Sequence, residues 1–416
     1  MSDAERSRIE MAIVRAMRQD RVSRRTFLGR AGKGGVALGA MLTLPGLLAA
    51  CGPEDADRAL EWANWCCYID IDEENPPDPT PYPSLNAFIA ATGIQVNYQE
   101  IITDNAEHLQ TLLPDLTNGN PTGWDLTTPG GWVVQRLGDL GYLEELDHAK
   151  LPNWSKNAAD YAVGQWFDPD NKYSVWWQGG ITGIGYDPTL TGRELTSFED
   201  LLHPDFAGRV GGFSDMRDMF GLTLLSLGIA PENATVDDVT RAQQKLLEAN
   251  ERDQFRGYYG NEYYDALAAG DLVASVAWSG DVTQMALYDN ANVRFVIPAE
   301  GGMRWNDNLA IPKGSTAKLD ETLKLIDYYY SLDAATLLSE YIGYFTGVAG
   351  VQERIEADVQ AARDSGDEET AAQLEATAAS VVPTPDQIDN TYPDKQLSQE
   401  EDDEWSALFE EVLRTA

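Results

Sequence analysis

The stretch LNAFIAATGIQVNY, residues 85–98, predicts a helix that passes directly into a β-strand. Leu85, Phe88 and Ile89 recur at the spacing of one helix face, and Gly93 is typical of a helix end. The residues after Gly93 alternate between apolar and polar, as they do along a half-buried strand. One helix–strand unit is therefore expected at this position.

The segments on both sides of this unit continue the same alternation. Leu60–Ile71 is predicted to be a strand and its following loop, Ala106–Leu113 a helix and Trp124–Thr128 a strand. Another helix should begin near Gly131. Because strands separated by helices pair mainly in parallel, we expect an α/β fold with a mostly parallel sheet.

A second series of strands and helices begins at residues 181–186. Its clearest element is a helix over Val236–Ala249, because Thr235 is a suitable N-cap and Asp238 follows three residues later. Residues 352–380 are rich in Ala, Glu, Asp and Gln, which predicts an exposed helical insert. The other elements expected in this half are strands at 208–213, 272–278, 293–297 and 307–311, a short helix at 197–202 and helices within 319–340.

The N-terminus carries the features of an export signal. A pair of arginines in Ser23–Leu28 precedes the run Gly34–Ala50, which is too short and too weakly apolar for a membrane span of about 20 residues. Small residues before Cys51 are typical of a lipoprotein processing site, and paired arginines are typical of twin-arginine export. We expect a signal peptide over 1–50, lipidation at Cys51 and a tether over 51–58, which would anchor the exported protein to the outer face of the cell membrane. The alternative is an arginine-rich surface helix that ends in a cysteine by chance.

The chain is strongly acidic, with a formal net charge of −38. Residues 1–50 carry nine Lys/Arg and four Asp/Glu, so 21 basic and 64 acidic residues remain after them. Such a surface repels polyanions, which argues against a nucleic-acid partner, and mildly attracts small cations. Acidity also favours solubility, so charge by itself identifies no ligand. The remaining length of about 360 residues predicts two domains.

Cysteine and histidine are too sparse to build a framework or a metal centre. Cys66 and Cys67 are the only cysteines after Cys51, and they are adjacent, so no disulfide framework is possible. They form either a vicinal disulfide or two small buried thiols. His108, His148 and His203 lie far apart, and we expect neither a metal site nor a cofactor.

No nucleophile elbow, phosphate-binding loop or HExxH motif is present, so the sequence does not predict an enzyme. Instead, aromatic residues repeatedly precede a carboxylate where strands are expected to end. Trp278 is followed by Asp281, Trp305 by Asp307, and Tyr68 by Asp70. An aromatic ring attracts an organic ammonium ion, and a carboxylate accepts its N–H donors. The alternative for each pair is a core residue followed by a turn.

Eight short segments between about residue 60 and residue 350 occur in a recognisable order: Asn64–Ile69, Ala91–Ile94, Trp124–Leu126, Leu137–Gly141, Ser214–Asp218, Ala277–Asp281, Trp305–Pro312 and Ile342–Tyr344. In this order they resemble the periplasmic spermidine/putrescine-binding proteins of polyamine ABC transporters. The collinear set is specific, although no single segment is.

This resemblance implies an α/β, two-lobed periplasmic-binding-protein fold. The lobes would be joined by crossing hinge strands near residues 180–186 and 303–312, and they would close over the ligand. The first lobe would comprise residues 59–182 and 308–350. The second would comprise residues 183–307 and 351–416, with the acidic helical insert near 352–380.

The resemblance also implies a ligand site. Asp307 and Asp281 would bind ammonium groups, and Asp215 or Asp218 would lie at or near another amine. Asp307 is the strongest prediction because it lies in the most recognisable segment. Six aromatic residues would line the slot and sandwich the methylene chain: Trp65, Tyr68, Trp132, Trp278, Trp305 and Tyr344.

We therefore expect a monomeric binding protein that captures putrescine, spermidine or another linear polyamine and delivers it to an ABC permease in the membrane. One alternative is a binding protein for another organic cation or an amino-acid-like solute. More distant alternatives are a secreted hydrolase with paired acids such as Asp215 and Asp218, and an adhesion or assembly lipoprotein.

Overall fold

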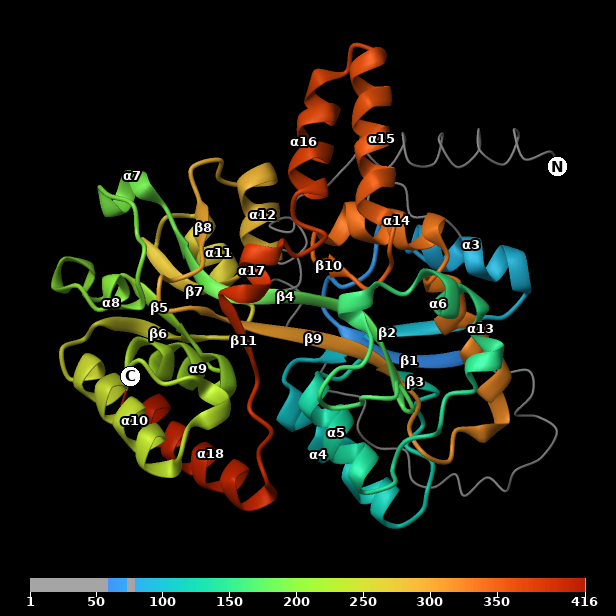
Figure 1. The fold of residues 1–416 in the computed structure, drawn as a ribbon, viewed down its shortest axis with the longest axis horizontal. Helices are drawn as coiled ribbons and strands as arrows, with labels where there is room; N and C mark the ends of the chain where they lie inside the picture. The colour runs from blue at the N-terminus through green and yellow to red at the C-terminus, as the bar shows by residue number, and fades with distance from the viewer. Residues whose placement is uncertain (1–58, 73–78, 416) are drawn as a thin grey trace, which may run out of the picture.

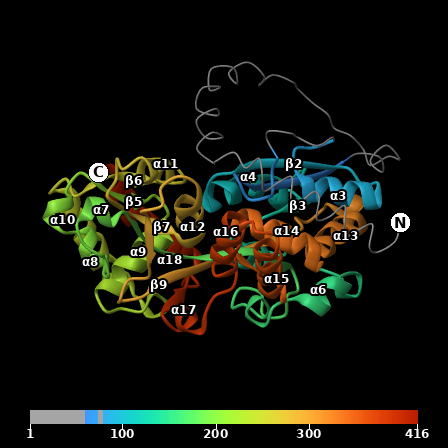
Figure 2. The same ribbon diagram turned by 90° about the horizontal axis from the view of Figure 1, so that it is seen from above.

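The computed structural model describes residues 59–72 and 79–415. The predicted signal peptide, Cys51 and the tether over 51–58 lie outside the described residues. In the described part, strands β1–β11 belong to one sheet, whose main path is β2-β1-β3-β9-β4-β7-β5-β6. The sheet passes through two α/β lobes at opposite ends of the molecule (Figure 1), and Figure 2 shows these lobes side by side from above.

Two long strands cross from one lobe to the other. β4 (Ser174–Tyr186) and β9 (Gly302–Ala310) run antiparallel, from the pair Ser174–Ala310 to the pair Thr182–Met303. Every residue of β4 is buried. The crossings that the sequence predicts near residues 180–186 and 303–312 overlap these two strands.

Some strands of each lobe pair in parallel, as the alternation of strands and helices predicts, but β3 pairs antiparallel with β9, and β4 pairs antiparallel with β7, β8, β9 and β10. The sheet is therefore mixed rather than mostly parallel. β1 (Leu60–Trp65) pairs in parallel with β2 and β3, and β5 (Val210–Phe213) pairs in parallel with β6 and β7. The other strands are β2 Val96–Ile102, β3 Leu126–Thr127, β6 Phe255–Tyr259, β7 Ala274–Trp278, β8 Arg294–Val296, β10 Phe345–Thr346 and β11 Thr391–Pro393.

Helix α3 (Pro83–Thr92) shows how the local sequence sets the first lobe. Proline stands in its first turn, and Gly93 ends it with a left-handed φ of 76°, which glycine adopts without steric cost. Leu85, Phe88 and Ile89 form its buried face, as their spacing predicts. The other helices of this lobe are α4 Asn105–Thr117, α5 Gly131–Asp139, α6 Pro152–Asn157, α13 Leu319–Tyr329 and α14 Leu332–Ile342.

Helix α10 (Val236–Asn250) begins with the predicted cap. The Thr235 hydroxyl accepts from the backbone N–H of Asp238, and the Asp238 carboxylate accepts from the backbone N–H of Thr235. This capping box satisfies two otherwise unpaired groups at the helix start. The remaining helices outside the first lobe are α7 Pro188–Thr191, α8 Phe198–Leu201, α9 Met216–Ser226, α11 Tyr263–Ala268, α12 Ser279–Tyr288, α17 Pro385–Asp389 and α18 Gln399–Arg414.

The helical hairpin of α15 (Val351–Asp364) and α16 (Glu368–Ala378) corrects one prediction. The sequence assigned residues 352–380 to the second lobe, but Ile355 and Val359 of α15 and Leu374 of α16 pack into the core of the first lobe. The cause is a narrow apolar stripe at helical spacing, which buries one side of each helix despite its acidic composition. The outer end of the hairpin projects away from both lobes (Figure 1).

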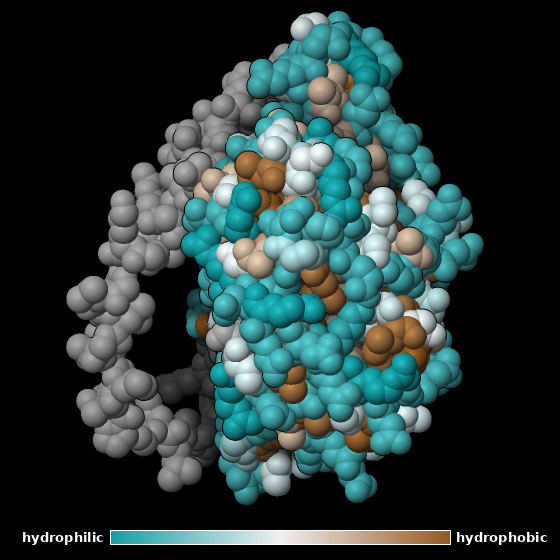
Figure 3. All heavy atoms as spheres, turned by 90° about the vertical axis from the view of Figure 1, so that its left-hand side faces the viewer, coloured by the Kyte–Doolittle hydropathy of each residue, from teal (hydrophilic) through white to brown (hydrophobic). Residues whose placement is uncertain are grey.

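Each lobe has its own apolar core. The first is built around Leu60, Trp62 and Ile326, and the second around Phe220, Leu246 and Phe409 of α18. The surface on the second-lobe side is mainly hydrophilic, with apolar residues in small scattered patches (Figure 3). Among residues 59–72 and 79–415, no helix has the length and apolar character needed to cross a membrane.

Candidate functional site

A cavity of about 170 Å³ lies where the two lobes meet the crossing strands. Its walls come from both lobes and from β9, so its shape depends on how the lobes sit together. All ten residues that the sequence predicts for the ligand site line this one cavity: Trp65, Tyr68, Trp132, Asp215, Asp218, Trp278, Asp281, Trp305, Asp307 and Tyr344. Whether they bind a ligand remains a prediction.

Asp307 lies on β9, where it is opposite Gln178 of β4 and forms an isolated bridge with Gly130. Its Oδ2 accepts a hydrogen bond of 3.0 Å from the Tyr68 hydroxyl, and the residue is 7% exposed. Burial raises the pKa of Asp307 to about 7, although the Tyr68 bond opposes the shift. At neutral pH this carboxyl is therefore close to its point of half-ionisation.

Asp281 occupies the first turn of α12 and is held by two tyrosines. Tyr344 donates to its Oδ1 at 2.7 Å, and Tyr263 donates to its Oδ2 at 3.0 Å. Tyr263 comes from α11 and Tyr344 follows α14, so the Asp281–Tyr344 bond joins segments from the two lobes. Hydrogen bonds to both oxygens fix the orientation of this carboxylate in the cavity wall.

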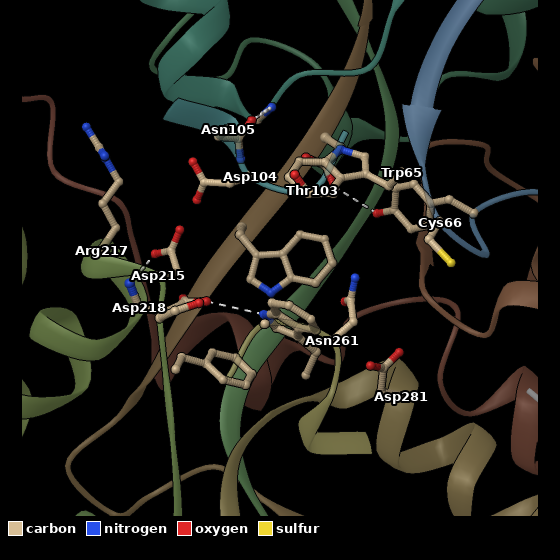
Figure 4. Close-up of a pocket in the computed structure, with 18 of the residues that line it drawn as sticks. Trp65, Cys66, Thr103, Asp104, Asn105, Asp215, Arg217, Asp218, Asn261 and Asp281 are labelled. Atoms are coloured by element: carbon tan, nitrogen blue, oxygen red, sulfur yellow. Dashed lines mark hydrogen bonds between the residues drawn. The ribbon is translucent and has the colours of Figure 1, made fainter. Parts of the chain in front are cut away.

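A second group of acids gathers at the start of α9. Asp215 caps this helix by accepting from the backbone N–H of Asp218 at 2.9 Å, and Asp218 accepts from the Trp278 indole at 3.2 Å. Burial raises the pKa of Asp215, and burial with the neighbouring Asp215 raises that of Asp218 well above its ordinary value. In Figure 4, Asp215 and Asp218 lie across the cavity from Asp281.

Among the described residues that line the cavity, Arg217 is the only one with a cationic side chain. Its guanidinium carbon is 3.8 Å from the centroid of the Trp132 ring, and its Nη2 is 2.5 Å from Oδ1 of Asp402. Arg217 lies on α9 and Trp132 on α5, so this cation–π contact also joins the lobes. One face of Trp132 is thus occupied by a cation of the protein itself.

The other aromatic residues form a continuous wall. Ring centroids are 6.4 Å apart between Trp278 and Trp305, 5.3 Å between Trp305 and Tyr344, and 6.0 Å between Tyr344 and Tyr68. All three pairs are edge-to-face, the arrangement that aligns positive ring edges with negative faces. Tyr68, at one end of this wall, donates to Asp307, and Trp278, at the other end, donates to Asp218.

Several wall residues were not predicted from the sequence. Asp104 caps α4 by accepting from the Glu107 N–H at 2.9 Å, and its cap position was the one available signal. Asp394 follows β11, and burial together with Asp215 raises its pKa to about 7, opposed by Arg217. No local pattern marks Asp394, because only the tertiary path of the C-terminal segment brings it to the cavity. The other polar or thiol residues that were missed include Cys66, Cys67, Thr103, Asn105, Ser214, Asn261 and Asn306.

Among residues 59–72 and 79–415, no three His, Cys, Asp or Glu side chains are placed to hold a metal ion. The cavity instead offers separate carboxylates between aromatic rings. This combination suits an organic cation with an apolar stem.

Comparison with known proteins places the chain among binding proteins. The sequence profile described as "Bacterial extracellular solute-binding protein" matches residues 84–365. The chain is 32% identical to spermidine/putrescine-binding periplasmic protein 1 of Haemophilus influenzae, over 72% of this chain and 81% of that protein. It is 28% identical to the putrescine-binding periplasmic protein PotF of Escherichia coli, over 80% of this chain and 89% of that protein.

A solved structure agrees with the two-lobed fold. The spermidine/putrescine ABC transporter substrate-binding protein PotD of Streptococcus pneumoniae superposes with a TM-score of 0.65 at 23% identity. The match covers 86% of this chain and 99% of that one. The α/β fold with two lobes and crossing strands is therefore confirmed, whereas the ligand of this chain has to be argued from its own cavity.

Proposed function

Because the chain belongs to the family of bacterial extracellular solute-binding proteins, we propose that it captures a linear diamine or polyamine between its lobes. Putrescine and spermidine are the ligands named for its relatives in Haemophilus influenzae and Escherichia coli. Members of this family bind solutes and are not enzymes, so the proposal involves no chemical step.

The charge imbalance of the cavity wall carries this proposal. Six aspartates line the cavity, and among the described residues of its wall Arg217 is the only one with a cationic side chain. Burying carboxylates without cations is unfavourable, which is why burial raises the pKa values of Asp307 and Asp394 to about 7. A ligand with two or more ammonium groups would supply the missing positive charge.

The arrangement of the acids favours a linear ligand. Asp307 with Tyr68 and Asp281 with Tyr344 provide one set of oriented acceptors, while Asp215 and Asp218 provide another beyond the aromatic wall. Each terminal ammonium group has three N–H donors, and a hydrogen bond to a charged group contributes about 1.5–3 kcal/mol. Methylene groups between the amines would lie against Trp278, Trp305 and Tyr344.

Contacts between the lobes point to capture by closure. The Asp281–Tyr344 hydrogen bond and the Arg217–Trp132 contact both break if the lobes separate. Hinge closure around a ligand is a common binding transition, and exclusion of water strengthens each carboxylate–ammonium pair. We propose that the first lobe comprises residues 59–182, 308–350 and 351–381. The second lobe would comprise residues 183–307 and helix α18.

Delivery would follow capture. We propose that the closed, liganded monomer docks on the permease of an ABC importer and releases the amine there. Residues 1–50 would direct export by the twin-arginine route, and lipid on Cys51 would hold the protein at the outer face of the membrane. High local concentration at the membrane would favour docking without further contacts.

A hydrolase and a carboxylate-binding site are less well supported. Asp215 caps α9 and Asp218 accepts from Trp278, so both carboxyls are fixed as hydrogen-bond acceptors rather than held as a pair of catalytic acids. Arg217, the group in the cavity wall that could bind a ligand carboxylate, already pairs with Asp402.

A thermal-shift series tests the proposal. Putrescine and spermidine should raise the unfolding temperature in a concentration-dependent manner, since a ligand that binds only the folded state stabilises it. 1,4-Butanediol, which has the length of putrescine but no charge, should have no effect. No shift with any linear amine, or an equal shift with the diol, would contradict the proposal.

A further inference from the structure

We propose that Cys66 and Cys67 are a reversible oxidation site that forms a vicinal disulfide at the edge of the ligand cavity. Both cysteines line the cavity, and Figure 4 shows Cys66 beside Trp65 at its edge. Both are thiols in the structure and half-buried, so a small oxidant can reach them. The effect of oxidation on ligand binding, described below, rests on the proposed function, whereas disulfide formation does not.

The sulfur atoms are already in contact. Sγ of Cys66 lies 2.8 Å from Sγ of Cys67, and a disulfide bond requires about 2.05 Å. Cys67 has a φ of 60°, in the left-handed region that non-glycine residues rarely adopt. Unusual backbone conformations of this kind concentrate at functional sites. The turn after β1 therefore holds the two thiols together at a cost in backbone energy.

The chemistry balances with a low-molecular-weight disulfide such as glutathione disulfide as the oxidant. The thiolate of one cysteine attacks a sulfur of the oxidant and displaces one thiolate, which leaves a mixed disulfide. The second cysteine thiolate attacks the protein sulfur of that mixed disulfide and displaces the second small thiolate. The protein loses two electrons and two protons, and the oxidant is reduced to two thiols.

Such a bond should be easily reduced. Neighbouring Cα atoms are about 3.8 Å apart across a trans peptide, below the usual range of about 4.4–6.8 Å for bridged cysteines. Strained disulfides are the labile ones that serve regulation rather than stability. A protein in an extracellular solute-binding family works outside the reducing cytoplasm, where such thiols meet oxidants.

Oxidation of the two cysteines would change the cavity wall by moving the residues on either side of them. Trp65 and Tyr68 are the immediate neighbours of the pair, and both line the cavity. The backbone N–H of Cys67 donates to Glu100 at 3.2 Å, and the Trp65 indole donates to the Thr128 carbonyl at 2.8 Å. Closing a small ring between residues 66 and 67 changes this turn, and with it the position of Tyr68 against Asp307.

Intact-mass measurement tests the bond on the full chain carrying Cys51→Ser, which leaves only this pair of cysteines. After incubation with glutathione disulfide, we expect a mass lower by two hydrogens, restored by dithiothreitol. The single variants Cys66→Ser and Cys67→Ser should instead retain one glutathione. An unchanged mass, or two retained glutathiones on the parent, would overturn the proposal.

Calorimetry on the same samples tests the effect on binding. Putrescine should bind the oxidised form about tenfold more weakly than the reduced form, equivalent to ~1.4 kcal/mol. The double variant Cys66→Ser/Cys67→Ser should give one affinity under both conditions. Equal affinity of the oxidised and reduced parent would refute the coupling. If neither form binds any amine, the proposed function fails, while the mass result still decides whether the disulfide forms.

Discussion

The hydroxyl of Tyr68 donates a 3.0 Å hydrogen bond to Oδ2 of Asp307, although 239 positions separate the two residues in the sequence. The bond joins the loop after β1 to the crossing strand β9. Tyr68 belongs to the aromatic wall of the cavity, and Asp307 is the strongest prediction among the ligand-binding carboxyls.

Asp307→Asn should abolish most of the ligand affinity without unfolding the protein. The amide keeps the shape of the carboxylate but not its charge, so we expect a loss of about 2–4 kcal/mol, or roughly 30- to 1,000-fold in Kd. Calorimetric titration with putrescine measures this loss. Asp320→Asn is the matched control, because Asp320 is an exposed partner of Lys150 away from the cavity. Unchanged affinity in Asp307→Asn would exclude Asp307 from the site.

The same substitution should stabilise the unliganded protein at pH 8. The folded-state pKa of Asp307 is about 7 and lies above its ordinary value, so the folded state holds the proton more tightly. The contribution of Asp307 to the free energy of unfolding is therefore fully present below about pH 4, and it is lost as the pH rises to about 7. Denaturant titration should show that Asp307→Asn gains roughly 1–3 kcal/mol over the parent at pH 8, and little at pH 4. A uniform loss at both pH values would contradict this assignment.

Ligand affinity should rise with pH through 7. Below that value Asp307 and Asp394 are increasingly protonated and cannot pair with an ammonium group. We expect the Kd for putrescine to fall between pH 5.5 and pH 7 by up to about tenfold per unit for each carboxyl that must ionise, and to level off towards pH 8. Titrations at constant ionic strength measure the profile. A flat profile over this range would show that buried carboxyls do not control binding.

Tyr68→Phe should move the midpoint of this pH profile upward. The Tyr68 hydroxyl stabilises the ionised form of Asp307 and thereby opposes the increase in its pKa. Without that donor, Asp307 would ionise only at a higher pH, so the loss of affinity should be greater at pH 7 than at pH 9. Tyr258→Phe is a suitable control, since Tyr258 bonds to Asn250 within the second lobe. An identical midpoint in Tyr68→Phe and the parent would contradict the role of the hydroxyl.

Asp402→Asn should weaken closure of the lobes. Asp402 of α18 lies 2.5 Å from Arg217 of the second lobe and 3.8 Å from Arg136 of the first, with all three side chains largely buried. Removal of this charge should raise the Kd several-fold and reduce its dependence on salt, because the lost pairs favour the closed form. Titrations at low and high salt measure both effects. Asp403→Asn, the next residue and exposed, should behave as the parent.

The sequence predicts elements and site residues best where one local pattern carries the information. The spacing of Leu85, Phe88 and Ile89 and the cap at Thr235 predict α3 and α10 correctly. The positions of the ten site residues in one cavity follow from the resemblance, because collinear segments imply a common topology. Asp307 and Asp281 lie on a crossing strand and at a helix start, where that topology fixes their direction.

What the sequence does not predict depends on tertiary packing. The hairpin α15–α16 joins the first lobe because Ile355 and Leu374 find apolar partners there, and composition alone does not identify those partners. Asp394 reaches the cavity only through the long path of the C-terminal segment. The contact of Arg217 with Trp132 also depends on the relative position of two helices, which no local spacing encodes.

The central claim is that the buried carboxyls of the cavity capture a linear amine. Calorimetric titration of the unmodified protein with putrescine, in two buffers of different ionisation enthalpy, tests this claim most directly. Because Asp307 and Asp394 are partly protonated at pH 7, capture of an ammonium group should release protons. We expect saturable one-to-one binding with a buffer-dependent heat for putrescine and no heat for 1,4-butanediol. Absence of saturable heat with putrescine and spermidine alike, or binding without proton release, would contradict it.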